Sequence, residues 1–428
     1  MSWEDCLCHP PIHPPLVLQH ASPSSSQDMA SLAGYPTSRV VQPIPIRLTP
    51  RLASMKHPPD DSAAKAHYVV LDGLRGVASL LVVVFHLFES YQNNPAKQWI
   101  NHGYLAVDFF FLLSGYVIGY AYDDRWPALS LREFCMRRLI RLQPMVIVGS
   151  VIGAALFYFQ ASPEFSLVAS TPPWQVVLLM ILGAAMIPVT PALDIRGWSE
   201  SYPLNGPAWS LFFEYIANFL YAAGLRKLSN KALWVLVVVA AGFLIHLAVT
   251  TPRGSLTGGW TIDAQELNIG VTRVMFPFFA GILLTRTGAR LKINHTFAAC
   301  SFLLVVALSL PKFGDASQLW INGLYEALCV ICVFPIIVCL GAGEQKVDGV
   351  SIRIARFFGD LSYPLYITHY PLIYIYAAWV LRQHPSLSSG VLLGILTLAL
   401  SVLIAYLALK LYDLPVRRRL SRRLLTNQ

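Results

Sequence analysis

The chain has 428 residues, of which 55% are hydrophobic and 13% charged, and its net charge is +9. Its mean hydropathy of +0.53 leaves too little polar surface for a soluble globular protein of this length. The excess of Lys and Arg is spread over short loops and the C-terminus. This placement is typical of membrane topology signals and argues against a nucleic-acid partner.

Residues 1–66 differ from everything that follows. Eleven of the chain's 29 prolines come before residue 60, mixed with serines and without helical periodicity. Such a segment buries too little apolar area to offset its ordering entropy, so we expect a disordered cytoplasmic extension. The alternative that translation begins at Met29 or Met55 stays open. No secretory signal precedes the first apolar segment, which would therefore act as an uncleaved insertion signal.

About eleven apolar stretches alternate with short polar loops over the rest of the chain. Their approximate bounds are 69–90, 103–121, 145–160, 174–187, 209–224, 232–250, 268–285, 296–311, 321–341, 361–381 and 389–412. Most reach the roughly 17–25 residues that a transmembrane helix needs, but 174–187 does not. The sequence therefore predicts an all-α polytopic membrane protein, with a membrane domain over 67–418 and a basic cytoplasmic tail over 419–428.

The basic loops predict the topology. Five arginines crowd the 122–143 loop, which places it in the cytoplasm together with the N-terminus. Three apolar stretches separate this loop from the next basic one at 225–231, and an odd number of spans cannot join two cytoplasmic loops. The shortest stretch, 174–187, is therefore expected to be re-entrant or interfacial. About ten transmembrane helices remain, with both termini cytoplasmic.

The first apolar stretch carries three ionisable residues, Asp72, Arg75 and His86. A charged side chain at membrane depth costs a few kcal/mol, so its presence suggests a function. Eleven helical residues turn through about 1100°, which leaves Arg75 and His86 about 20° apart on one face and about 16 Å apart along the axis. This spacing predicts a polar path into a helix bundle.

Further motifs follow this R-x10-H pair. They are Asp108-Phe-Phe-Phe-Leu-Leu-Ser114-Gly115-Tyr116, Arg137-Arg138-Leu-Ile-Arg141-Leu-Gln-Pro144, Trp209-Ser210-Leu-Phe-Phe-Glu214, Leu361-Ser362-Tyr363-Pro364-Leu365-Tyr366-Ile-Thr-His369 and Asp413-Leu-Pro415. In order, spacing and membrane setting they resemble the acyltransferase-3 family, integral-membrane enzymes that O-acylate extracytoplasmic carbohydrates and related acceptors. The resemblance runs from about residue 67 to 418. Asp413 departs from the pattern, in which a glutamate is expected.

Acyl transfer from a thioester to a hydroxyl needs a base for the hydroxyl proton and stabilisation of the oxyanion that develops. Desolvation keeps a buried histidine neutral near pH 7, so His86 is the candidate base. Arg75 and Glu214 complete the predicted catalytic set. Two alternatives stay open. In one, His86 only forms a hydrogen bond between helices, and in the other, Glu214 is a purely structural ion-pair partner.

Three arginines predict a site for the acyl donor. Arg138 and Arg141 are three residues apart at a helix end, Arg137 lies beside them, and Pro144 is expected to open the next span. A guanidinium suits phosphate, and coenzyme A carries a pyrophosphate and a 3′-phosphate. We therefore expect acyl-CoA, acetyl-CoA in the first instance, as co-substrate. The alternative is that these arginines only anchor the topology at lipid headgroups.

Four residues are candidates for binding the acceptor: Asp108, Tyr363, Tyr366 and His369. Asp108 could equally orient a histidine, fix an arginine or bind hydroxyls, and His369 could orient substrate or hold the bundle together. No metal is expected, because the Cys329–Cys332 CxxC pair lies in an apolar helix without a second pair or flanking histidines.

These features predict an O-acyltransferase of a bacterial inner (cytoplasmic) membrane. It would move an acyl group from cytoplasmic acyl-CoA to a hydroxyl of a cell-surface glycan, its lipid-linked precursor or a secreted small molecule, with membrane lipid around it. The rival is a secondary transporter or exporter of a small polar solute. No pair of similarly interrupted helices recurs in the two halves, which argues against an inverted-repeat carrier. Oligomeric state, acceptor identity and acyl chain length stay open.

Overall fold

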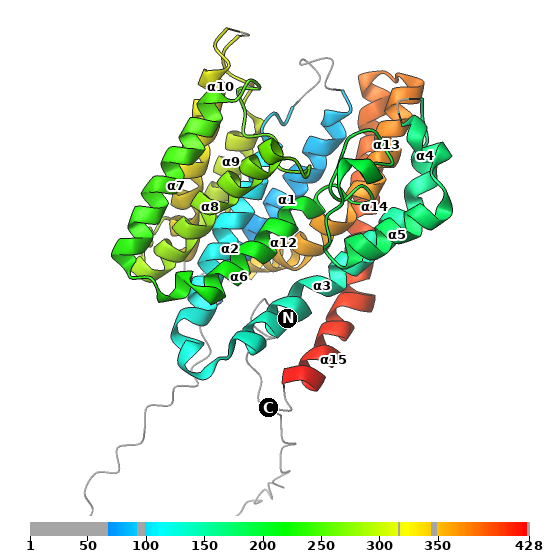
Figure 1. The fold of residues 1–428 in the computed structure, drawn as a ribbon. Helices are drawn as coiled ribbons and strands as arrows, with labels where there is room; N and C mark the ends of the chain where they lie inside the picture. The colour runs from blue at the N-terminus through cyan, green and yellow to red at the C-terminus, as the bar shows by residue number, and fades with distance from the viewer. Residues whose placement is uncertain (1–66, 92–98, 164, 316, 344–348, 426–428) are drawn as a thin grey trace, which may run out of the picture. The chain divides into compact units, whose positions relative to one another are not determined.

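The computed structural model describes residues 67–91, 99–163, 165–315, 317–343 and 349–425, and it is 79% helical (Figure 1). This described part contains no β-strand, so the predicted all-α fold is confirmed. The predicted disordered extension over 1–66 lies outside the described residues, as do 426–428.

The longer helices are α1 (Val69–Glu89), α2 (Ala106–Tyr122), α3 (Leu131–Leu156), α6 (Ala208–Ala223), α7 (Asn230–Thr250), α8 (Ala264–Thr287), α12 (Gly349–Thr368) and α14 (Leu387–Ala408). The shorter ones are α4 (Ser166–Ser170), α5 (Pro173–Ala184), α9 (Thr296–Ser309), α10 (Trp320–Leu328), α11 (Phe334–Gly343), α13 (Tyr370–Gln383) and α15 (Leu414–Leu425). Short π-helical turns join α10 to α11 and α14 to α15.

Seven helical stretches of the described residues are long and apolar enough to cross a membrane. They are Val69–Glu89, Gly103–Ala128, Leu131–Gln160, Asn230–Thr250, Ala264–Thr287, Trp320–Gly343 and Leu387–Leu425. Large apolar side chains also cover outward-facing surfaces, such as Val238 and Phe243 on α7 and Leu396 and Leu403 on α14. Apolar surface of this extent on the outside of a bundle is typical of contact with lipid.

The remaining predicted spans correspond to shorter or more polar helices. Stretches 209–224 and 296–311 form α6 and α9, while α12 and α13 together contain 361–381. Helix α5, at 12 residues, rises only about 18 Å, well short of a hydrocarbon core of about 30 Å. This length is consistent with the prediction that the 174–187 segment does not cross the membrane. The count of ten spans and the sidedness of the termini stay predictions.

The expectation of a loop over 122–143 with Pro144 opening the next helix is wrong. Helix α3 begins at Leu131, where the Ser130 hydroxyl accepts a hydrogen bond from the Glu133 N–H (3.1 Å), and it runs through Pro144. The first half of α3 is rich in Arg and Leu, which favour helix, and proline removes only one hydrogen bond. The predicted tail is likewise helical as far as Leu425.

The expectation of one uninterrupted span over 361–381 is also wrong. Helix α12 ends at Thr368, α13 begins at Tyr370, and the chain bends at His369. Pro371 has no N–H to donate to the Ile367 carbonyl one turn earlier. The side chain of Asn205 takes its place and donates to that carbonyl at 2.8 Å. Proline and a distant asparagine therefore place His369 at a helix break.

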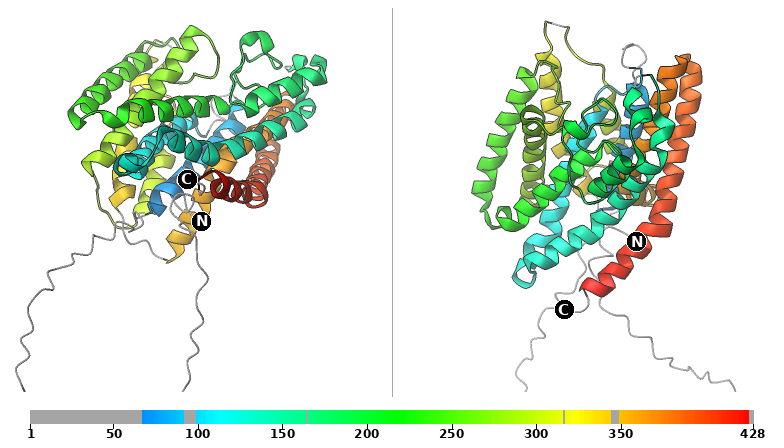
Figure 2. Two further views of the ribbon diagram at one scale, coloured as in Figure 1. Left: turned by 60° about the horizontal axis from the view of Figure 1, so that its bottom comes forward. Right: turned by 45° about the vertical axis from the view of Figure 1, so that its right-hand side comes forward.

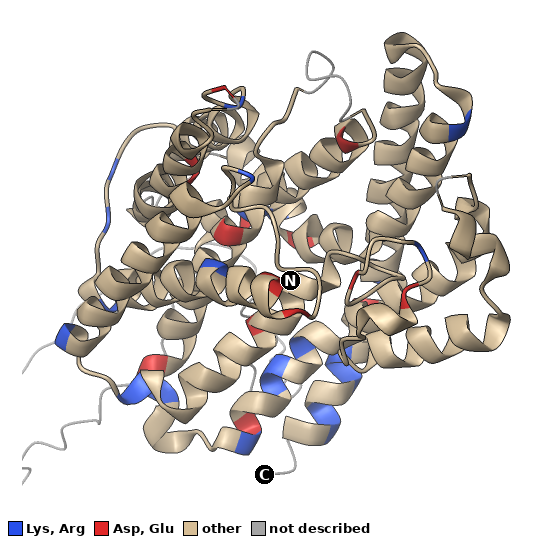
Figure 3. Cartoon of the chain, turned by 45° about the horizontal axis from the view of Figure 1, so that its top comes forward, with Lys and Arg blue, Asp and Glu red and all other residues tan. Residues whose placement is uncertain are grey.

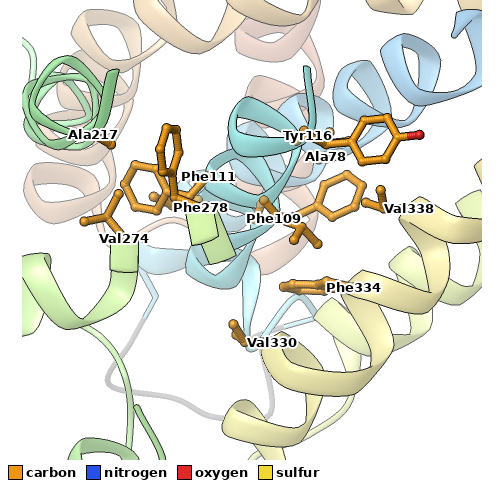
Figure 4. Packing of buried hydrophobic residues seen from close by; sticks show 14 of the residues in the cluster. Ala78, Phe109, Phe111, Tyr116, Ala217, Val274, Phe278, Val330, Phe334 and Val338 are labelled. Carbon is orange, nitrogen blue, oxygen red and sulfur yellow. The ribbon is translucent and has the colours of Figure 1, made fainter. Parts of the chain in front are cut away.

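The core lies where α2 packs against α8 and α1 packs against α12. A Cβ at Gly115 would lie 2.1 Å from the Phe278 carbonyl oxygen, so the backbones of α2 and α8 approach closely only because residue 115 is glycine. Phe109 and Phe334 meet edge to face with ring centroids 5.5 Å apart, and Figure 4 shows this pair among other interdigitating residues. This close packing gives α1 and α8 fixed positions beside the cavity described below.

Helix α15 continues from α14 at an angle and packs against α3 (Figure 2). Lys and Arg gather at this end of the described chain, on α15 and on the first half of α3 (Figure 3). The most basic end of the described residues is therefore built by segments from the first third and from the end of the chain.

Candidate active site

A cavity of about 500 Å³ lies beside the C-terminal end of α1, with α13 and the loops around residues 198–209 and 257–260 forming other walls. Its aromatic lining includes Trp198, Trp209, Trp260, Tyr366, Tyr370 and Tyr374. Its charged or titratable lining consists of His86, Glu89, Glu200 and Arg273. A largely apolar, aromatic cavity with a few convergent polar groups is the usual form of a small-molecule site.

His86 lies at the wall of this cavity in a defined orientation. Its Nδ1 is 2.8 Å from Glu89 Oε2, one turn later on α1. Its ring stacks on that of His369 (centroids 5.6 Å apart, 27° between planes), and the Tyr370 ring meets it edge-on at 4.7 Å. If Glu89 accepts from Nδ1–H, Nε2 carries the lone pair, and the imidazole can act as a base through that nitrogen.

Glu89 is a residue that the sequence analysis missed. Its signal is the spacing His86-Leu-Phe-Glu89, because residues three apart share a helix face. Glu89 lies near the end of the predicted 69–90 stretch, where a polar residue is expected at the membrane boundary and carries no signal of its own. The structure keeps it within the last turn of α1.

His369 supports His86 from behind the cavity wall. It is fully buried, and its Nδ1 lies 3.0 Å from the Leu365 carbonyl oxygen and 2.9 Å from that of Tyr366. These carbonyls favour the tautomer with a proton on Nδ1. Tyr366 does line the cavity, with its hydroxyl 2.8 Å from that of Ser210.

Arg75 lies away from the cavity in a second polar region, which we call the arginine cluster: Arg75, Arg138 and Arg141 around Glu214. Arg138 donates to Glu214 Oε1 at 3.0 Å, and Ser114 Oγ donates to the same oxygen at 2.9 Å. Arg75 donates to Asp72 at 2.9 Å and interacts electrostatically with the three other members of the cluster. Four predicted site residues, on α1, α3 and α6, are therefore brought together.

Two other predicted site residues lie near this cluster without reaching the cavity. Tyr363 donates to the Leu142 carbonyl at 2.6 Å and interacts electrostatically with Arg141 and Glu214. Arg137 pairs with Glu133 one turn back on α3, at 2.5 Å. Of the predicted acceptor-binding set, Tyr366 is thus the member that lines the cavity.

Asp108 fixes an arginine, one of the three roles left open for it. Both residues of this pair are buried, and Arg273 reaches the carboxylate of Asp108 through Nη2 (2.6 Å) and Nε (3.2 Å). Arg273 also donates to the carbonyls of Gly258 (3.0 Å) and Tyr104 (2.8 Å), so it ties the 257–260 loop to α2 and α8. Sequence analysis missed Arg273, although an arginine inside the apolar 268–285 stretch is itself a signal.

Within the described residues, no three His, Cys, Asp or Glu side chains gather closely enough to hold a metal ion. Two polar sites lie along α1, about 16 Å apart, as three turns of helix require. One is an open aromatic cavity with a histidine–carboxylate pair, and the other is a dense arrangement of arginines and a carboxylate.

The fold and these sites define a multi-pass helical membrane protein with two polar sites, the cavity and the arginine cluster. The acyltransferase domain of the acyltransferase-3 family matches residues 68–408, and the chain belongs to this family of acyltransferases. The family predicted from the motifs is therefore confirmed.

Named relatives are similar over different shares of the chain. The "Protein 2 in picA locus" of Rhizobium radiobacter is 31% identical over 189 residues, which cover 42% of this chain and 95% of that protein. The "O-acetyltransferase OatA" of Staphylococcus aureus is 23% identical over 365 residues, and the "Peptidoglycan O-acetyltransferase OatA" of Listeria monocytogenes 24% over 379. These two matches cover 82% and 81% of this chain but only 57% and 55% of those longer proteins. No solved structure matches the chain.

Proposed function

We propose that this protein transfers an acyl group, acetyl in the first instance, from cytoplasmic acyl-CoA to a hydroxyl of a cell-surface glycan or its lipid-linked precursor. Support comes from the family and from the names of two relatives, which are O-acetyltransferases. The observation that carries the proposal is the His86–Glu89 pair at the wall of the aromatic cavity.

In the proposed reaction, His86 Nε2 removes the proton of the acceptor hydroxyl as its oxygen attacks the thioester carbonyl. The tetrahedral intermediate collapses, the C–S bond breaks, and an ester forms on the acceptor. The leaving thiolate takes the proton from His86, which returns the imidazole to its neutral form. Glu89 holds the ring orientation and stabilises the transient imidazolium, and these contributions strengthen as charge develops.

The arginine cluster is the proposed site for the phosphates of the donor. Guanidinium groups match phosphate geometry, and the cluster brings three of them near one carboxylate. The flexible arm of coenzyme A between its phosphates and its thioester would then extend along α1 toward His86. This arrangement separates recognition of the donor from chemistry at the acceptor.

We place the arginine cluster near the cytoplasmic face of an inner membrane and the cavity toward the outer face, because the most basic end of the described chain lies on the side of α3 and α15. Cysteine labelling in a cysteine-free background tests this. Ser166→Cys and Ala192→Cys should react with an impermeant reagent added outside, and Ser130→Cys should react only after permeabilisation. Labelling of all three from one side would contradict the placement.

The function itself is tested by release of free coenzyme A from acetyl-CoA by the purified protein in proteoliposomes. Release that depends on added glycan acceptor, and that His86→Gln abolishes, is the expected result. Uptake or export of solute without thioester consumption would instead identify a carrier.

A further inference from the structure

The loop between α5 and α6 contains a tightly built turn over Asp194–Glu200. The carboxylate of Asp194 accepts hydrogen bonds from the backbone N–H groups of Arg196 (2.8 Å), Gly197 (3.0 Å) and Ser199 (3.0 Å). Gly197 has φ +96° and Ser199 has φ +53°. A left-handed conformation is uncommon for residues other than glycine, and such strained positions concentrate at functional sites.

Arg196 locks this turn onto the bundle. It is 1% exposed, and its guanidinium lies over the Tyr374 ring of α13 at 3.4 Å. It donates to Gln160 Oε1 at 2.7 Å and to the Pro203 carbonyl at 2.8 Å. The turn therefore has a fixed position relative to α13, which also carries part of the cavity wall.

Glu200 ends the turn and lines the cavity while being only 6% exposed. Tyr374 donates to its Oε2 at 2.5 Å, and Arg196 Nε lies 3.8 Å from the same oxygen. Oε1 has no hydrogen-bond partner among the described residues. Gly206 leaves room for that oxygen, because a Cβ there would lie 2.6 Å away. A buried carboxylate with one oxygen uncommitted is poised to accept a hydrogen bond from a ligand.

Trp198, from the same turn, supplies a flat apolar surface at the cavity. It is 42% exposed, and its ring is held by Phe165 (centroids 5.0 Å apart) and Tyr374 (5.9 Å). Tryptophan exposes a large rigid face at little entropic cost, which suits stacking against the C–H face of a sugar ring. Trp198 and Glu200 thus present an apolar face and a hydrogen-bond acceptor side by side.

The charged groups around the cavity are engaged by near neighbours. Arg273 is ion-paired with Asp108, Glu200 lies beside Arg196, and Glu89 accepts a hydrogen bond from His86. Asp194, also close to Glu200, is occupied by the backbone N–H groups of its own turn. The arginines near the cavity, Arg273 and Arg196, are thus committed to carboxylates, so the cavity fits an uncharged ligand better than an anionic one.

We propose that the Asp194–Glu200 turn binds the acceptor: Glu200 accepts a hydrogen bond from one hydroxyl of a neutral pyranose stacked on Trp198, and so presents another hydroxyl to His86. The presentation of a hydroxyl to His86 rests on the proposed function, whereas binding of the sugar by the turn does not. Glu200 is a positioning residue, because it binds the acceptor without touching the acyl group.

The binding step is tested first, by calorimetric titration of the protein in detergent with N,N′,N″-triacetylchitotriose, cellotriose and the cationic trimer chitotriose. Glu200→Gln should raise the dissociation constant of at least one neutral trimer about tenfold, as expected for loss of one hydrogen bond. Trp198→Leu should weaken it comparably, and it tests the same wall if Glu200→Gln fails to fold. Trp234→Phe, on the exposed face of α7, is the matched control and should bind like the wild type.

Transfer kinetics separate positioning from a structural role. Glu200→Gln should raise the KM for the acceptor about tenfold while the KM for acetyl-CoA and kcat stay within about twofold. Unchanged acceptor binding and KM in Glu200→Gln, tighter binding of the cationic trimer, or no binding of either neutral trimer by the wild type would each overturn the inference. Saturable, Glu200-dependent binding without any release of coenzyme A would leave the acceptor site standing and refute the acyltransferase proposal.

Discussion

The cavity around His86 and the arginine cluster around Arg75 lie on one helix and use charge in opposite ways. In the cavity, His86 has a single carboxylate partner and a wall of aromatic rings beside about 500 Å³ of space. In the cluster, Glu214 Oε1 already accepts from Arg138 and Ser114. The first region is arranged to admit a ligand, and the second holds a network that a ligand would have to enter.

This difference shows why a charge at membrane depth does not by itself define a role. Arg75 and His86 are on the same face of α1, yet the neighbours of Arg75 are ionic, whereas aromatic rings surround His86. Ionic neighbours suit a phosphate-bearing donor or a structural network, and aromatic ones suit a sugar. Variants in each region should therefore change different kinetic constants.

The largest effect is expected from the base. His86→Ala and His86→Gln should both lower kcat by about 10²-fold or more, the usual contribution of a positioned base, with normal amounts in the membrane. The measurement is the initial rate of acceptor-dependent coenzyme A release. Substantial activity of His86→Gln would show that the imidazole only forms hydrogen bonds and would direct attention to His369.

The donor site should respond through a different constant. Arg141→Ala should raise the KM for acetyl-CoA by roughly ten- to a hundredfold, because one charge-assisted phosphate contact is worth about 1.5–3 kcal/mol, and leave the acceptor KM unchanged. Arg132→Ala, on the exposed side of the same helix, is the control. Reduced yield with normal kinetics would mean that the cluster is structural. Arg138→Ala is a poorer test, because it removes the ion-pair partner of Glu214.

A smaller effect is expected at the partner of the base. Glu89→Gln should lower kcat about tenfold with both KM values nearly unchanged, because it removes a charge-assisted hydrogen bond worth about 1.5 kcal/mol that orients His86. Steady-state kinetics at saturating concentrations of both substrates measure this. If Glu89→Gln behaves like the wild type, the pair is incidental to catalysis.

The last effect concerns stability rather than catalysis. Burial raises the pKa of Glu200 from 4.5 to about 7. The folded state therefore binds this proton more tightly than the unfolded state. Protonation of Glu200 stabilises the folded state fully below about pH 4.5, and this stabilisation is lost as pH rises through about 7. The loss is at most about 3 kcal/mol. Thermal unfolding between pH 5 and 8 should show a fall in Tm with rising pH that is weaker in Glu200→Gln. Parallel pH dependences would show that Glu200 does not titrate in this range.

Local sequence determined much of this protein, because helix periodicity and apolar length depend on neighbours along the chain. It indicated the all-α membrane class, the shared face of Arg75 and His86, and the motifs that identify the family. It also contained the spacing of His86 and Glu89, which needs only one turn of helix. The family assignment and the helical class could therefore be reached before any tertiary contact was known.

Only the tertiary structure decided which polar groups meet. Asp108 could have served three roles until α8 placed Arg273 against it, from 165 residues away. The helix break at His369 depends on Asn205, which donates a hydrogen bond to the Ile367 carbonyl because Pro371 has no N–H to do so. The turn that carries Glu200 reaches the cavity because Arg196 is buried on Tyr374. Such pairings depend on packing between distant segments, and no local pattern encodes which segments come together.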